Sequence, residues 1–207
     1  MQGAAQSFSI AYRVDTANSF SWHFPASADN IFPAASNLLR WGTTYGNSPA
    51  SIDYSVDNGA TWLPVSSNIN LSLGYTRWIA PDTNTTALLR MNIGINRFVS
   101  DTFTITAKPD IHVGFNCPDS VLLYWNKNKG VNCYWIYGLG SKYLQSVTAV
   151  PDTQFIFNKA NLPYRNFAVA AILGNKTGVK SYTIDYHDQG VECYISNLTA
   201  DLINNNN

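Results

Sequence analysis

The segment Ser-Val-Asp-Asn-Gly-Ala-Thr-Trp at residues 55–62 decides the fold class, because it places a tight turn between two strands. In residues 50–56, which lead into it, β-branched and aromatic side chains alternate with short polar ones. Such alternation is typical of a half-buried strand. In the turn, Asp and Asn can hydrogen-bond to their own backbone, and Gly59 accepts a positive φ without steric cost. The segment therefore predicts a β-hairpin whose second strand begins near Thr61.

The same strand pattern continues along the whole chain. Short segments rich in β-branched and aromatic residues recur roughly every 8–12 residues, divided by Gly, Pro, Asn and Asp. No segment keeps apolar residues at helical spacing over three turns, so the sequence predicts an all-β fold. The strands expected in the first half are 7–14, 19–24, 37–42, 50–56, 61–66, 71–79, 87–93 and 101–106. Those expected in the second half are 112–117, 120–126, 133–139, 143–150, 154–158, 166–172 and 180–186.

Lys-Pro-Asp at residues 108–110 interrupts this rhythm. Proline cannot sit in a central strand, and the strand pattern restarts after it. We therefore expect two consecutive β-sandwiches, 1–108 and 109–188. Residues 189–207 are expected to form a C-terminal tail, partly disordered or the start of a further segment.

Two motifs in the second unit resemble fibronectin type III domains. Val-Leu-Leu-Tyr-Trp-Asn at 121–126 is similar to the second strand of that family, with Trp125 in the core. Tyr-Trp-Ile-Tyr at 134–137 is similar to the third strand. The resemblance implies that Trp135 and Tyr137 face away from the core, and that Tyr134 and Ile136 face it.

The sixth strand departs from the pattern of that family. Fibronectin type III domains usually carry a Tyr at the head of this strand, where its hydroxyl fixes the preceding corner. Here Phe167 occupies that position, or Tyr164 replaces it in a shifted register.

In the first unit, Ser55, Asp57, Gly59, Thr61 and Trp62 spell Ser-x-Asp-x-Gly-x-Thr-Trp. This resembles the Asp-box, a turn found in sialidases, in other sugar-acting enzymes and in immunoglobulin-like domains of secreted bacterial proteins. In those families the turn lies away from catalytic centres, which implies a structural hairpin here. A sialidase propeller would repeat the motif about every 40–50 residues. The sequence contains one copy, which favours a sandwich.

The pairing of the two units resembles the tail region of large secreted hydrolases and peptidases of Bacteroidota. The first unit is similar to an immunoglobulin-like module of such proteins, through Leu-Arg-Trp at 39–41, the Asp-box segment and Tyr-Thr-Arg-Trp-Ile-Ala-Pro at 75–81. This resemblance implies a secreted or cell-surface location.

The balance of charge and the length of the apolar runs each exclude one class of partner. Thirteen basic residues balance thirteen acidic ones, so the chain has no basic excess with which to displace counterions from nucleic acid. No apolar run approaches the roughly 18 residues of a membrane span. We therefore expect no nucleic-acid partner and no membrane insertion.

Catalytic and metal-binding patterns are missing from the sequence. His23, His112 and His187 fall in separate segments, and no Gly-x-Ser-x-Gly nucleophile motif occurs. Hydrolysis of glycosides requires two close carboxylates across a cleft, which a small sandwich does not provide. We expect no catalytic residue, no cofactor and no metal ligand. One calcium ion at Asp57 or in the turn 185–188 is the alternative to plain turns there.

Three cysteines leave the pairing to be decided by topology. In a fibronectin-like arrangement Cys117 ends the first strand, and Cys193 follows the seventh at the same pole. Cys133 begins the third strand at the opposite pole. If a disulfide exists, the resemblance implies that it joins Cys117 to Cys193.

The sequence leads to two hypotheses of function. The first is a non-catalytic spacer and interaction module of a larger secreted or surface protein, with the neighbouring domains of the parent chain as partners, and with a polysaccharide or a surface protein as further candidates. The alternative is a carbohydrate-binding module, in which Trp135 and Tyr137 stack on sugar rings. A catalytic domain would require a deep pocket with two close carboxylates or a histidine-anchored triad.

Overall fold

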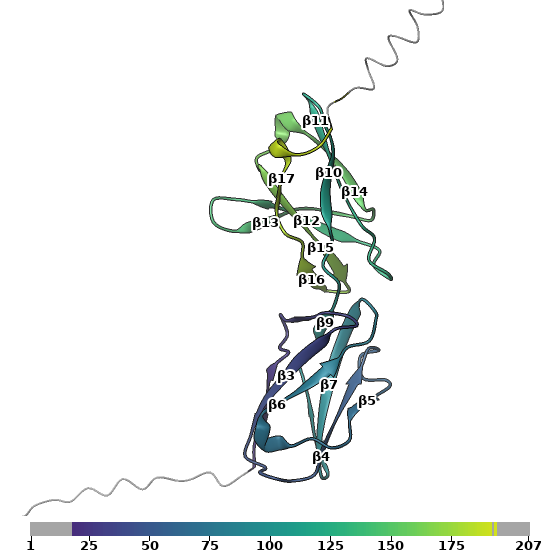
Figure 1. The fold of residues 1–207 in the computed structure, drawn as a ribbon, viewed down its shortest axis with the longest axis vertical. Coiled ribbons are helices and arrows are strands. Elements are labelled where there is room, and N and C mark those ends of the chain that lie inside the picture. Colours follow the sequence, from purple (N-terminus) through teal and green to yellow (C-terminus); the bar gives the residue numbers. More distant parts are fainter. Residues whose placement is uncertain (1–17, 192, 194–207) are drawn as a thin grey trace, which may run out of the picture.

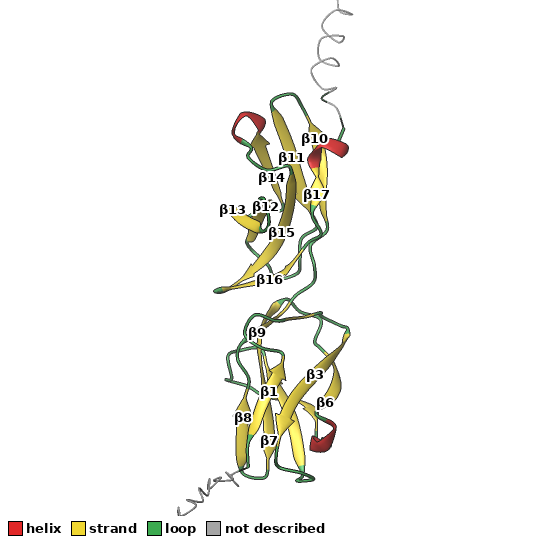
Figure 2. Cartoon of the chain, turned by 90° about the vertical axis from the view of Figure 1, so that its left-hand side faces the viewer, coloured by secondary structure: helices red, strands yellow, loops and turns green. Residues whose placement is uncertain are grey.

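The computed structural model describes residues 18–191 and residue 193 of the 207. These residues form two β-sandwiches that lie end to end, with β1–β9 in one and β10–β17 in the other (Figures 1 and 2). This confirms the all-β class of two consecutive immunoglobulin-like or fibronectin type III sandwiches. No helix in this part of the chain is long and apolar enough to cross a membrane. The strand expected at 7–14 lies outside the described residues.

The first sandwich packs a sheet in the order β1-β3-β6 against a sheet in the order β2-β9-β7-β4-β5, with β8 also paired to β7. All pairs are antiparallel except β2 with β9. The strands are β1 (Phe20–Phe24), β2 (Asn30–Ile31), β3 (Ser36–Thr43), β4 (Ala50–Ser55), β5 (Leu63–Ser66), β6 (Tyr75–Ile79), β7 (Thr85–Ile93), β8 (Asn96–Val99) and β9 (Phe103–Ile105).

The second sandwich repeats this strand order, except that its described residues contain no counterpart of β2. One sheet runs β10-β11-β14, and the other runs β13-β12-β15-β16, with β17 also paired to β15. The strands are β10 (Ile111–Asn116), β11 (Ser120–Trp125), β12 (Tyr134–Leu139), β13 (Leu144–Val150), β14 (Gln154–Asn158), β15 (Asn166–Leu173), β16 (Lys176–Lys180) and β17 (Ile184–Asp185). Three short 3-10 helices complete the described residues: η1 (Leu71–Leu73), η2 (Lys159–Asn161) and η3 (Tyr186–Asp188).

Both sandwiches break their last strand at a buried serine. Ser100 lies between β8 and β9, and Ser181 lies between β16 and β17. Each hydroxyl accepts a hydrogen bond of 2.9 Å from a backbone N–H of the neighbouring strand, that of Leu89 or of Val169. Each hydroxyl also donates to the carbonyl of the residue that follows it. The serine side chain therefore satisfies backbone groups that a continuous strand would have paired.

The strands expected at 101–106 and at 180–186 contain β9 and β17, but the preceding strands β8 and β16 were not predicted. Each of these preceding strands begins directly after a turn at Gly94 or Gly174, whose φ values are 57° and 61°. Residues 175–180 are largely polar. In residues 95–99 the apolar side chains Ile95, Phe98 and Val99 do not alternate with polar ones, so neither segment carries the pattern on which the prediction depended.

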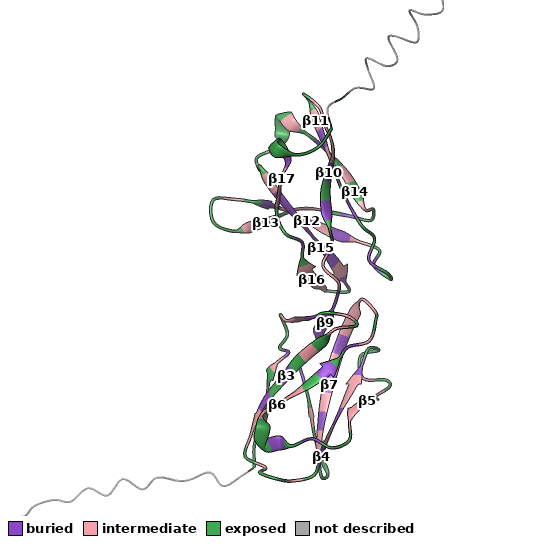
Figure 3. Ribbon diagram, in the orientation of Figure 1, coloured by how far each residue is buried: buried purple, intermediate pink, exposed green. Residues whose placement is uncertain are grey.

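Each sandwich encloses its own core (Figure 3). Trp41 in β3 and Trp125 in β11 are each 3% exposed and belong to the two cores. In the second core, the Trp125 ring packs edge-on against Tyr134 at 5.6 Å. The expected strand 71–79 is shorter than predicted, because residues 71–73 form η1. The Asn70 side chain accepts a hydrogen bond from Ser72 N–H at the start of η1, and Gly74 turns the chain with φ 70°.

The hairpin at 55–62 is held by side-chain hydrogen bonds within a few residues. Ser55 Oγ donates to Asp57 Oδ1 at 2.7 Å and accepts from Gly59 N–H at 2.8 Å. The Asp57 carboxylate also accepts from the Thr61 hydroxyl and from Thr61 N–H. The hydroxyl bond of Thr61, followed by its N–H and by Ser55, lowers the pKa of Asp57 from 3.8 to about 2. The carboxylate therefore stabilises the turn in its charged form.

The second sandwich continues past residue 188, where a separate tail was expected. Val191 N–H donates to the Gly114 carbonyl at 2.9 Å, and Asn116 N–H donates to the Val191 carbonyl at 3.0 Å. A disulfide joins Cys117 to Cys193, with their Cα atoms 5.3 Å apart. The segment that follows η3 is thus fixed to β10, by backbone pairing and by a covalent bond.

Candidate interaction surface

Trp135 and Tyr137 lie on the outer face of the larger sheet of the second sandwich. Both belong to β12, which pairs with β13 on one side and β15 on the other. Their neighbours Tyr134 and Ile136 are 1% and 0% exposed and belong to the core. The period of two along the strand therefore directs the other two side chains outward.

Two alanines of β15 form the floor beside these rings. Ala170 lies opposite Trp135 in register, and Ala168 lies opposite Tyr137. Both alanines are fully buried although they are on the outer face, since the large aromatic side chains cover the small ones. The same packing leaves Trp135 and Tyr137 half-buried rather than fully exposed.

Tyr137 is further covered by β16. The Lys180 ammonium lies 4.9 Å from the centre of its ring, and the hydroxyl forms a side-chain hydrogen bond with Thr177. Burial raises the pKa of the Tyr137 phenol, against the opposing effect of the Thr177 hydrogen bond. This face thus presents a flat aromatic surface, a neutral hydroxyl and a cation, which suits stacking and hydrogen bonding rather than proton transfer.

The corresponding face of the first sandwich carries a polar cluster that sequence reasoning missed. Arg90 in β7 forms two hydrogen bonds with Asp53 in β4, at 2.6 and 3.2 Å, and its guanidinium lies 4.2 Å from the Trp62 ring. Asn92 donates to the same carboxylate at 2.9 Å. Asp53 and Arg90 are opposite each other in register, so the strand pairing would have revealed the contact. Trp62 therefore packs onto its own sheet through Arg90.

The three histidines lie apart from one another in the described part of the chain. His23, His112 and His187 are all exposed and lie on different elements. The described residues contain no group of three or more His, Cys, Asp or Glu side chains that could hold a metal ion.

The turn at η3 uses its carboxylate for folding. Asp185 accepts from His187 N–H at 2.9 Å and from Arg165 Nε at 2.5 Å. Burial alone would raise the pKa of Asp185, but the hydrogen bonds from His187 and Arg165 outweigh it and lower the pKa. Like Asp57, this carboxylate is stabilised by donors of the protein itself.

Tyr164 has taken a position that the fibronectin resemblance left open. Its hydroxyl donates to Gln145 Oε1 at 2.8 Å, a side chain of the neighbouring β13. Its ring lies against Gly138, where a Cβ would come within 2.2 Å of the ring. Phe167 is fully buried in the core. Tyr164 thus links the loop before β15 to strands β12 and β13 of the larger sheet.

The two sandwiches meet around Ala107, whose backbone is held from both sides. Its N–H donates to Asn84 Oδ1 of the first sandwich at 2.8 Å. Its carbonyl accepts from Asn128 Nδ2 of the second sandwich at 2.7 Å. Asn84 Nδ2 also donates across the junction to the Lys129 carbonyl at 3.0 Å. The side-chain amides of Asn84 and Asn128 therefore hold the short connection between the two sandwiches.

Further contacts reinforce this junction. The Lys176 ammonium donates to the Ser27 carbonyl at 2.6 Å. Thr106 is fully buried against Gly178, where a Cβ would come within 2.3 Å of the Thr106 methyl group. Strand β16 therefore packs directly on the end of the first sandwich.

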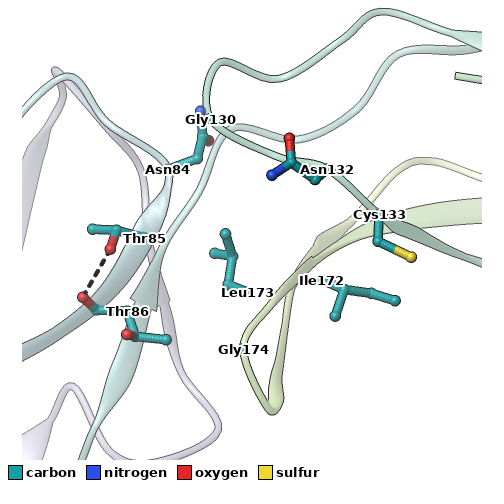
Figure 4. Close-up of a pocket in the computed structure, with 9 residues that line it drawn as sticks. All are labelled: Asn84, Thr85, Thr86, Gly130, Asn132, Cys133, Ile172, Leu173 and Gly174. Carbon is teal, nitrogen blue, oxygen red and sulfur yellow. Dashed lines mark hydrogen bonds between the residues drawn. The ribbon is translucent and has the colours of Figure 1, made fainter. Parts of the chain in front are cut away.

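A hollow of about 420 Å³ lies beside this junction (Figure 4). Its lining residues come from both sandwiches and are Asn84, Thr85, Thr86, Gly130, Asn132, Cys133, Ile172, Leu173 and Gly174. None of these is a carboxylate or an imidazole, so the hollow provides neither the close acid pair nor the histidine-anchored triad that catalysis would require.

Neither the known protein-family models nor the curated protein sequences match this chain. Among solved structures, it is similar to a segment of two fibronectin type III domains from chicken tenascin, with a TM-score of 0.42, 14% identity and coverage of 81% of this chain and 97% of that chain. It is also similar to the FN1–FN3 domains of chicken CNTN1, with a TM-score of 0.32, 16% identity and coverage of 77% and 68%. The ligand-binding domain of human OSCAR is a third, with a TM-score of 0.30, 12% identity and coverage of 81% and 97%.

Proposed function

We propose that this chain is a non-catalytic spacer and interaction module within a larger secreted or cell-surface protein. The observation that carries the proposal is the clamped junction. Asn84 and Asn128 bind the Ala107 backbone from opposite sides, and Lys176 and Gly178 add contacts across the same boundary. Two sandwiches held in one orientation set a defined distance and direction between whatever flanks them.

The disulfide supports the proposed location. Disulfides persist in oxidising surroundings such as the cell exterior and are rare where thiols are kept reduced. The bond between Cys117 and Cys193 also secures the C-terminal end of the second sandwich. The proposed parent is a large hydrolase or peptidase of the Bacteroidota type that the sequence resembles, and the direct partners are its neighbouring domains.

The fixed orientation can be tested by residual dipolar couplings of backbone amides. We expect both sandwiches of the native chain to fit one alignment tensor. A double variant, Asn84→Ala with Asn128→Ala, removes both partners of the Ala107 backbone, so the two sandwiches should then need separate tensors while each remains folded.

The matched control is Asn132→Ala, an exposed amide close to the same junction. It should leave the single tensor unchanged. If the native chain already required two tensors, the junction would not hold the sandwiches together and the spacer proposal would fail.

The second candidate function is carbohydrate binding, favoured by the outward direction of Trp135 and Tyr137 over a floor of small side chains. A sugar ring could stack on Trp135 while its hydroxyls meet the Tyr137 phenol and Lys180. Polysaccharide pull-down and glycan arrays test this directly. Trp135→Ala should abolish retention on the polysaccharide without changing the thermal midpoint of unfolding by more than a few degrees. The control is Tyr124→Ala, at an exposed tyrosine of the opposite sheet, which should bind as the native chain does. The same retention for both variants would exclude this surface as the sugar site.

A further inference from the structure

One exposed face in the first sandwich combines apolar and basic side chains. It is the outer face of the sheet β1-β3-β6, remote from the larger sheet that carries the Asp53–Arg90 pair. Leu38 and Arg40 of β3, and Tyr75, Arg77 and Ile79 of β6, all point outward and are exposed. Ile79 is 70% exposed and Tyr75 is 49% exposed, and Arg77 lies between them on the same face.

The backbone of β6 adds a second feature to this face. In the described part of the chain, β3 is the only strand that pairs with β6, so β6 is an edge. The hydrogen bond from Trp41 N–H to the Gly74 carbonyl, at 2.9 Å, fixes which residues of β6 face β3. Thr76 and Trp78 exchange hydrogen bonds with β3, so the N–H and C=O groups of Tyr75, Arg77 and Ile79 point to the open edge.

The side chains and the backbone groups of Tyr75, Arg77 and Ile79 are therefore both accessible to a partner at this edge. Edge strands in native proteins are normally protected by proline, by a bulge, by charges or by a covering segment. The pairing of β6 with β3 is regular, without a bulge, and Arg77 is the one charge on the strand. A short peptide in the extended conformation could add to this edge as a further strand.

The charge on this face selects the chemistry of the partner. Strands β1, β3 and β6 contain Arg40, Arg77 and His23 but no Asp or Glu. Among the described residues, neither arginine forms an ion pair. An added strand would place its outward side chains beside Tyr75, Arg77 and Ile79, so the matching order is apolar, acidic, apolar at every second position.

A second copy of this chain fits the edge less well. Antiparallel pairing of two β6 strands about their centre would set Arg77 opposite its own copy. Like charges directly opposite each other across a strand pair are destabilising. The charges on this face therefore favour a different, acidic partner over self-association.

We propose that the open edge of β6 binds an extended acidic segment of a partner protein. The segment pairs with the backbone of Tyr75, Arg77 and Ile79 as an added strand. It places a carboxylate beside Arg77, and apolar side chains beside Tyr75 and Ile79. This surface is separate from Trp135 and Tyr137, so its test is independent of the proposed carbohydrate site.

The probe is a fluorescein-labelled peptide, acetyl-Thr-Val-Thr-Glu-Thr-Val-Thr-amide, titrated with the full chain by fluorescence anisotropy. The matched peptide carries Lys in place of Glu. We expect the Glu peptide to bind at least about tenfold more tightly than the Lys peptide. Arg77→Glu should reverse this preference. Ile156→Thr, on the edge strand β14 of the second sandwich, should leave it unchanged.

The backbone contribution needs its own test. Arg77→Ala removes the charge but keeps the edge N–H, whereas Arg77→Pro removes both and leaves the hydrogen bonds to β3 intact. The proline variant should bind at least about fivefold more weakly than the alanine variant. If the proline variant does not fold, N-methylation of alternate peptide residues serves instead, and one of the two alternating sets should abolish binding to the native chain.

Three outcomes would overturn the proposal. The Glu and Lys peptides could bind equally, which removes the charge argument. Alanine and proline at position 77, or the two N-methylated peptides, could behave alike, which removes strand addition. A concentration-dependent dimer in sedimentation velocity that is lost in Arg77→Glu would identify a second copy of the chain as the occupant of this edge.

Discussion

The two sandwiches share a strand order and a device for breaking the last strand, but they are locked by different chemistry. In each, a buried serine, Ser100 or Ser181, supplies hydrogen bonds where the last strand is interrupted. The first sandwich fixes a hairpin through the Asp57 carboxylate. The second fixes its C-terminal end through a disulfide between Cys117 and Cys193. One fold can thus be secured by a titratable group or by a redox-sensitive bond, and the two halves should respond to different conditions.

The largest expected effect is the loss of the disulfide. Because Cys117 and Cys193 are 76 residues apart, the bond closes almost the whole second sandwich. In the chain-entropy description, its removal by Cys193→Ser costs the second sandwich about 4 kcal/mol of unfolding free energy. Urea unfolding followed by amide NMR signals of each sandwich measures this separately.

The first sandwich should keep its own midpoint in that experiment, and Cys133→Ser is the matched control because its thiol is outside the disulfide. An equal loss in both sandwiches would break the comparison, since it would mean that they unfold as one cooperative unit.

The next effect is smaller and should be the same in both halves. Ser100→Ala and Ser181→Ala each leave a buried backbone N–H without its hydroxyl partner, which costs about 1–3 kcal/mol. Each substitution should lower the midpoint of its own sandwich only, by similar amounts. Ser66→Ala, at the end of β5, should change neither. If the two substitutions lowered the unfolding free energy by clearly different amounts, the two serines would contribute unequally to stability despite their similar hydrogen bonds.

The smallest effect is a dependence on pH confined to the first sandwich. Hydrogen bonds hold the folded-state pKa of Asp57 at about 2, below its ordinary value of 3.8. A depressed folded pKa adds stability that is present above the unfolded value and is lost as pH falls toward the folded value. Between about pH 4 and about pH 2, the thermal stability of the first sandwich should therefore fall more in the native chain than in the Asp57→Asn variant. Thermal unfolding at several pH values, read from first-sandwich signals, would contradict this if both curves ran parallel.

Much of the architecture followed from local patterns. The resemblance of 134–137 to the third strand of fibronectin type III domains predicted that Tyr134 and Ile136 face the core, and that Trp135 and Tyr137, which alternate with them, face outward. It could not predict that Ala168, Ala170 and Lys180 would leave the aromatic pair half-buried, because that depends on which strands lie beside β12. The same limit explains why the Asp53–Arg90 pair was missed: its members are 37 residues apart and meet only through strand register.

The sequence by itself determined the fold class and the hairpin at 55–62. These features depend on side-chain alternation and turn chemistry, which act over a few residues. Only the tertiary structure decided the clamp of Asn84 and Asn128 on Ala107, the break at each buried serine and the open edge of β6. Each of these depends on which segments, distant in the sequence, become neighbours, and local patterns carry no information about that.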